Sequence, residues 1–166
     1  MTFQEALARA KKEAERGLTA FFAKKRQEAK KISPHCLMLV DSVAEFTMRG
    51  GKRTRAFLCW LGAQTTKETK ISKELRYAMM ALELFQSFAL IHDDIIDGDT
   101  IRRGGPTVHE QLGVPIAILA GDLALVWADE LMGMGGEMNI YIRMKQEVIF
   151  GQSLDVIRKQ KKIGIS

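Results

Sequence analysis

The sequence predicts an all-α fold, and two observations lead to this prediction. Apolar residues recur near helical spacing along most of the chain. Strand signals are nearly absent, because no sustained alternation occurs and no Asn-Gly or Asp-Gly pair stands between two apolar runs. With 166 residues and no internal repeat, we expect one domain covering residues 1–166. The expected architecture is therefore a compact helical bundle.

Capping and breaking residues delimit the predicted helices. Ser33 and Pro34 are typical of an N-cap and a first helical residue, and this helix should end near Met48, before Gly50-Gly51. A Gly- and Pro-rich loop with basic residues is expected at 98–106, and glycines 133, 135 and 136 should break a helix. The remaining helices are expected at about 2–30, 52–64, 72–97, 115–132 and 138–160, with a helical turn at 107–112.

Composition narrows the class of protein. The net charge of +5 suits nucleic acid, an anionic membrane or phosphorylated small molecules. Aromatic residues are not interleaved with the basic ones and no nucleic-acid motif is present, so we expect no nucleic-acid partner. Most lysines lie in the first thirty and last ten residues, where we expect them to be solvated.

Three further features bear on location. No apolar run reaches the roughly 20 residues that a membrane span needs. The charged N-terminus is unlike a secretory signal. Cys36 and Cys59 lie far apart without metal-ligand spacing, which favours reduced thiols in a cytoplasmic protein.

The sharpest signal is a cluster of carboxylates in the segment 92–99. Asp93 and Asp97 are four residues apart and project from one helix face. Asp94 lies on the flank, and Asp99 follows. Carboxylates are hard ligands suited to Mg²⁺, which is usually held by one or two of them together with substrate phosphates. The alternative is an acidic helix end in water, which the helix dipole disfavours.

Two basic segments complement the carboxylates. Arg102 and Arg103 precede a glycine pair, where guanidinium groups and an approachable backbone suit a diphosphate. Gly50-Gly51 is followed by Lys52 and Arg55 at a predicted helix start, a position that favours anions. Either segment could instead be a solvated basic turn. Together with the acidic cluster, they predict a site where Mg²⁺ and arginines share one diphosphate.

These motifs, in this order, resemble the trans-isoprenyl diphosphate synthases. The residues before the metal motif are similar in pattern to those of archaeal geranylgeranyl diphosphate synthases. The resemblance implies an isoprenoid-synthase fold around a deep cavity, of which this chain would form the N-terminal half. It also implies Mg²⁺-dependent condensation of isopentenyl diphosphate with an allylic diphosphate, giving geranylgeranyl or farnesyl diphosphate. The segments that carry it are 50–55, 90–97, 102–104, 120–122 and 151–155.

The resemblance also implies roles for individual residues. Asp93 and Asp97 would be the Mg²⁺ ligands, with Asp94 supporting them, and Arg102 would bind the allylic diphosphate. These four residues form the expected catalytic set. The remaining residues expected to bind substrate are Lys52, Arg53, Arg55, Gln86, Arg103, Gln152 and Asp155.

The resemblance further implies that Phe88, with small Ala89 beside it, limits product length. On a straight helix Phe88 lies about 140° from Asp93, so it would need a bend or an oblique approach to reach the same cavity. A plain core phenylalanine is the alternative.

The chain departs from the family pattern in lacking a second aspartate-rich motif and the Lys-Thr pair before it. Three interpretations stay open. The chain is a truncated fragment, a half-protein completed by a second chain in a homo- or hetero-oligomer, or a non-catalytic diphosphate-binding subunit. A symmetric dimer, each half giving one Asp93–Asp97 pair, is one form of the second interpretation.

Overall fold

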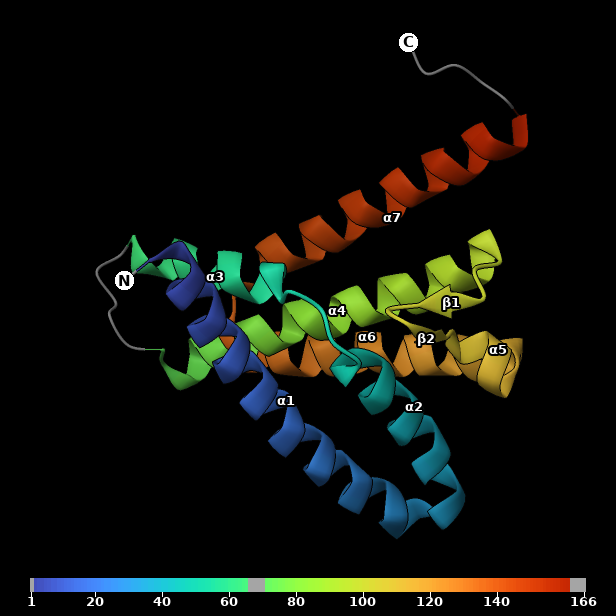
Figure 1. The fold of residues 1–166 in the computed structure, drawn as a ribbon, viewed down its shortest axis with the longest axis horizontal. Coiled ribbons are helices and arrows are strands. Elements are labelled where there is room, and N and C mark those ends of the chain that lie inside the picture. The colour runs from blue at the N-terminus through green and yellow to red at the C-terminus, as the bar shows by residue number, and fades with distance from the viewer. Residues whose placement is uncertain (1, 66–70, 162–166) are drawn as a thin grey trace.

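A computed structural model describes residues 2–65 and 71–161, and within them the expected all-α fold is confirmed. Figure 1 shows long helices with one small hairpin between α4 and α5. The elements are α1 (Phe3–Ile32), a 3-10 turn η1 (Pro34–Cys36), α2 (Leu37–Met48), α3 (Thr54–Gln64), α4 (Lys73–Asp97), β1 (Ile101–Arg102), β2 (Gly105–Pro106), α5 (Val108–Leu112), α6 (Val114–Gly135) and α7 (Met138–Lys161).

Side-chain caps fix the starts of α1, η1 and α4. Thr2 and Glu5 form a reciprocal capping box at the start of α1. The Ser72 hydroxyl accepts a hydrogen bond from the Leu75 N–H, which fixes the start of α4. Ser33 caps as predicted, but it opens η1 before α2 begins.

A hairpin and the end of one helix differ from the sequence prediction. The expected loop at 98–106 contains the antiparallel pair β1–β2, in which Ile101 faces Pro106 and Arg102 faces Gly105. The prediction that Gly133 breaks a helix was wrong, because α6 continues to Gly135. A single exposed glycine costs a helix only about 1 kcal/mol, which the packing of α6 offsets.

The centre of the molecule is the pair α4 and α6, which lie side by side in Figure 1. Four fully buried alanines at helical spacing form one face of α6, so the two backbones approach closely. The main apolar core lies around this pair and continues into α1 and α2. The alanines are Ala117, Ala120, Ala124 and Ala128.

A second, smaller core joins the first half of α1 to α3. Small residues of α1 (Ala10 and Ala14) pack against the aromatic side chains of Phe57 and Trp60, and Met79 of α4 completes the cluster. Helix α3 is thereby fixed against α4, and the basic segment that precedes α3 has a rigid support.

Helix α7 packs most closely at its beginning, where buried Tyr141 meets Phe85 with ring centroids 6.0 Å apart. Farther along, it runs beside α4 at a distance that leaves many of its apolar side chains exposed (Figure 1). The groove between α4 and α7 is where the candidate site lies. None of the described helices is both long and apolar enough to cross a membrane.

Candidate active site

The acidic motif occupies the last turns of α4. Asp94 is fully buried, and its Oδ1 accepts from Nε of Arg102 at 2.7 Å. Burial raises the pKa of Asp94, although the Arg102 guanidinium opposes this shift. Arg102 also lies 2.6 Å from Asp99, so one arginine joins two carboxylates of the cluster.

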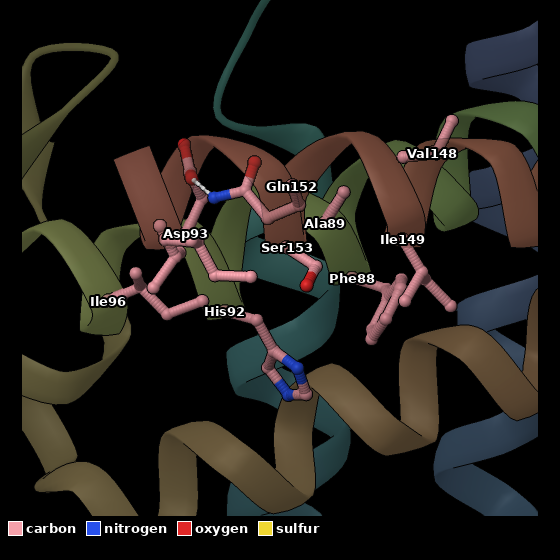
Figure 2. A pocket seen from close by; sticks show the side chains of 11 residues that line it. Phe88, Ala89, His92, Asp93, Ile96, Val148, Ile149, Gln152 and Ser153 are labelled. Atoms are coloured by element: carbon pink, nitrogen blue, oxygen red, sulfur yellow. Dashed lines mark hydrogen bonds between the residues drawn. The ribbon is translucent and has the colours of Figure 1, made fainter. Parts of the chain in front are cut away.

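The other two carboxylates face α7. Nε2 of Gln152 donates to Oδ1 of Asp93 at 2.6 Å, as Figure 2 shows. Nζ of Lys159 donates to Oδ1 of Asp97 at 2.8 Å and lies 2.9 Å from Oδ2 of Asp155. The expectation that Asp93 and Asp97 share a helix face agrees with this geometry. Gln152 and Asp155 reach them from the facing helix.

Lys159 was missed as a functional candidate. It belongs to the C-terminal lysines predicted to be solvated; its side chain is exposed, but it also pairs with Asp97 and Asp155. Asp97 and Asp155 raise its pKa by hydrogen bonding, so it stays protonated. The available signal was its position four residues after Asp155, the spacing of a helical ion pair.

An apolar cavity of about 360 Å³ lies between α4 and α7. Asp93 and Gln152 stand on one side of it, and Phe88 and Ile149 lie farther along (Figure 2). Most of its lining is apolar, which suits a hydrocarbon chain whose polar end reaches the carboxylates. Its lining residues are Phe88, Ala89, His92, Asp93, Ile96, Val148, Ile149, Gln152, Ser153, Val156 and Ile157.

Phe88 reaches the cavity despite its angular separation from Asp93 on a straight helix. Its ring packs edge-on against His92 at a centroid distance of 4.9 Å. A Cβ added to Gly121 of α6 would overlap the His92 ring, so this glycine makes room for the imidazole. Phe88 and Ala89 both line the cavity.

A second cavity of about 280 Å³ adjoins the first. Arg55 of α3 and Gln86 of α4 both line it, so the structure brings together two residues that the sequence placed 31 positions apart. Ala89 and Val148 line both cavities. Two ligands bound in them would therefore both contact Ala89 and Val148.

The two basic segments meet near Gly51. A Cβ on Gly51 would lie 3.5 Å from the guanidinium carbon of Arg103, so glycine allows this close approach. Burial lowers the pKa of Arg103, and the nearby charge of Arg53 lowers it further. Lys52 and Arg55 are exposed and form no ion pair within the described part of the chain. The region therefore has excess positive charge available to an anion.

Arg53 departs from the expected direct contact with substrate. Its side chain is only 1% exposed and points into the interior. Nε lies 3.2 Å from Oε1 of Glu15, and Nη1 lies 3.4 Å from Oε2 of Glu83. Buried between two carboxylates, this guanidinium cannot face a ligand in the neighbouring cavities.

The carboxylate pair suits a magnesium ion shared with a ligand. Among the described residues, no three His, Cys, Asp or Glu side chains form a metal cluster. Asp93 and Asp97 nevertheless supply two hard oxygen donors on one face, and the Lys159 ammonium stands in for a cation at Asp97. Because Mg²⁺ commonly takes one or two carboxylates and completes its shell with phosphates and water, the donor set fits.

The site combines carboxylates at one end of an apolar cavity with arginines nearby, an arrangement that suits a ligand with an apolar chain and a phosphate head. Comparison with known sequences agrees. The profile of the Polyprenyl synthetase family matches residues 37–165, and the chain belongs to this family.

Among similar sequences, farnesyl diphosphate synthase of Haemophilus influenzae is 33% identical over 148 residues, covering 81% of this chain and 50% of that enzyme. Geranylgeranyl diphosphate synthase of Sulfolobus acidocaldarius is 43% identical over 83 residues, covering 50% of this chain and 24% of that enzyme. The chain thus spans about half the length, or less, of the curated relatives it matches.

The chain also matches about half of a related solved structure. A geranylgeranyl pyrophosphate synthase from Corynebacterium glutamicum, complexed with isoprenyl diphosphate and magnesium, superposes with a TM-score of 0.83 at 30% identity. The match covers 98% of this chain and 52% of that protein. The fold is therefore that of an isoprenoid synthase, over about half of the larger protein.

Proposed function

We propose that this chain contributes the first-half active site of a Mg²⁺-dependent prenyltransferase, which condenses isopentenyl diphosphate with an allylic diphosphate to form a short-chain product. The observation that carries the proposal is the pair of adjoining cavities with Ala89 and Val148 in common. The first would hold the allylic chain, because it is apolar and ends at Asp93. The second would hold isopentenyl diphosphate, because Arg55 and Gln86 line it.

The residues would act on charge and position. Bound Mg²⁺ would supply Lewis-acid stabilisation of the leaving diphosphate. Asp93 and Asp97 would hold the ion, and Arg102 would donate to diphosphate oxygens as negative charge develops. The allylic C–O bond breaks, the isopentenyl double bond forms the new C–C bond, and a proton leaves with the released diphosphate. The apolar walls would keep water from the allylic cation.

Fixing both substrates side by side would supply much of the rate acceleration. Lys52, Arg55 and Arg103 would hold the second diphosphate, with Gln86 beside them. Gln152 would release Asp93 when the ion binds. The free thiols of Cys36 and Cys59 fit the cytoplasmic location that we propose.

We further propose that a second chain completes the active site, in a homo- or hetero-oligomer. The alternatives are a diphosphate-binding subunit without turnover and a truncated fragment of such a synthase. The test is to incubate the purified chain with Mg²⁺, labelled isopentenyl diphosphate and each allylic primer, and to separate products by length.

An Asp93→Asn, Asp97→Asn variant is the control for this assay, and light scattering gives the mass of the active species. Product that disappears in the variant supports the proposal. Binding of both diphosphates without product would support the non-catalytic alternative. Absence of any diphosphate binding would contradict both. A mass corresponding only to monomer at working concentrations would exclude a homo-oligomer.

A further inference from the structure

The turn before α3 is held by an unusual buried arginine. Gly50 and Gly51 have φ angles of 106° and 113°, and Arg53 has φ 52°. Glycine adopts such angles readily, whereas a residue with a Cβ does so at an energetic cost. Arg53 therefore needs compensating contacts to stay in the left-handed region.

Those contacts come from two other helices. Glu15 of α1 and Glu83 of α4 hold the guanidinium from two directions. Glu83 is itself only 5% exposed, so its charge depends on this partner. Among the residues that the structure describes, Nη2 of Arg53 is buried without a hydrogen-bond partner, so the ion pairs with Glu15 and Glu83 are what compensates the buried charge there.

Glu83 also performs a second task. Arg53 is the N-cap residue of α3 but makes no side-chain capping bond. Oε1 of Glu83 instead accepts from the Ala56 N–H at 3.1 Å, one of the amides that a cap would satisfy. One carboxylate on α4 thus fixes both the backbone turn and the first helical turn that follow Gly51.

The residues that this arrangement positions are Lys52 and Arg55, directly before and two residues after Arg53. Both are exposed, and Arg55 lines the second cavity with Gln86, three residues after Glu83 on α4. The buried pair therefore ties the cationic side of this cavity to the helix that supplies its polar wall.

We propose that Glu83 and Arg53 are positioning residues for the second diphosphate, with Glu15 in support. They act through Lys52 and Arg55 and do not touch the ligand. This inference rests on the proposed function, since it presumes that Lys52 and Arg55 bind isopentenyl diphosphate.

The first test replaces Glu83 by Gln, which keeps the shape and an acceptor for Ala56 but removes the charge opposite Arg53. Calorimetry would measure the affinity for isopentenyl diphosphate and, separately, for geranyl diphosphate with Mg²⁺. Displacement of the Lys52 and Arg55 side chains should weaken isopentenyl diphosphate binding by roughly 10- to 100-fold, because small displacements of binding groups have effects of this size. Geranyl diphosphate affinity should stay within about twofold, since Glu83 lines neither cavity.

The Arg53→Met, Glu83→Gln double variant covers the case in which an unpaired buried arginine prevents folding, because it leaves no orphaned charge. Glu130→Gln is the matched control, since its Lys25 ion pair lies away from both cavities. The proposal is overturned if the folded double variant binds isopentenyl diphosphate as the parent chain does, or if both ligands weaken equally. Failure of the parent chain to bind either diphosphate would instead overturn the proposed function, and this inference with it.

Discussion

Two glycines near the end of α6 should respond to alanine in opposite directions. A Cβ on Gly135 would lie 2.8 Å from both the carbonyl carbon and Cα of Glu74, and closer still to its carbonyl oxygen. These are backbone atoms at the start of α4, which cannot rotate away as a side-chain end can. A Cβ on Gly133 meets no atom within 4 Å, and the residue is exposed.

The magnitudes follow from these surroundings. Alanine gains about 1 kcal/mol over glycine in a helix interior, which Gly133→Ala should realise almost fully. Overpacking at Gly135 should cost about 3 kcal/mol, the upper end of the usual range, because backbone has to move. Set against the gain of about 1 kcal/mol in helix propensity, the net loss for Gly135→Ala is about 2 kcal/mol.

Thermal unfolding followed by circular dichroism would measure both variants. At about 2–4 °C per kcal/mol for a chain of this size, Gly133→Ala should raise Tm by about 2–4 °C and Gly135→Ala should lower it by about 4–8 °C. A Gly135→Ala protein as stable as the parent would refute the close approach of α6 to the start of α4. The neighbouring Gly133→Ala variant controls for helix propensity.

Three further predictions concern the site. Phe88→Ala should lengthen the product by opening the apolar cavity, and unchanged product length by chromatography would contradict a role for Phe88 in limiting it. Lys159→Met should raise Mg²⁺ affinity without substrate, because no ammonium then competes at Asp97; calorimetry showing equal or weaker binding would exclude this competition. Burial raises the pKa of Cys59, so its thiolate fraction at pH 8 is low. Iodoacetamide should therefore modify Cys59 more slowly than Cys36, and the rate for Cys59 should still rise above pH 9. Mass spectrometry that shows this rate levelling off below pH 9 would contradict the prediction.

Local signals predicted the helices because their determinants are close in sequence. The Ser72 cap bonds only three residues away, and the glycines after α2 act on their own backbone. The hairpin escaped prediction because each strand has only two residues, too few for alternation to be recognised. At Gly133 tertiary packing overrode a weak local preference.

The site was predictable where its chemistry lies in one segment. Asp93 and Asp97 share a helix face by spacing alone. That the Arg53 side chain points into the interior was not predictable, because its partners Glu15 and Glu83 are 38 and 30 residues away in the chain. The ion pair between Lys159 and Asp97 spans 62 residues. Such contacts depend on how the helices cross, which residue patterns do not specify.

The four carboxylates form two pairs. Asp94 and Asp99 hold Arg102 in place, whereas Asp93 and Asp97 could exchange their present partners for a metal ion. Asp94 is buried, and it holds Arg102 together with Asp99 at the hairpin that follows α4. Removing Asp94 should therefore displace the hairpin as well as change the charge. Asp93 and Asp97 have partners from α7 instead: the Gln152 amide donates a hydrogen bond to Asp93, and the Lys159 ammonium pairs with Asp97.

Long, partly exposed side chains can leave such contacts at little cost, whereas removing Arg102 from Asp94 would leave a buried carboxylate without its partner. The cluster of four carboxylates is thus tolerated without a ligand, because the chain supplies its own partners. A cation brought by a diphosphate would need to displace only the partners from α7. The groove between α4 and α7 would then respond to ligand, while the hairpin that carries Arg102 stays fixed.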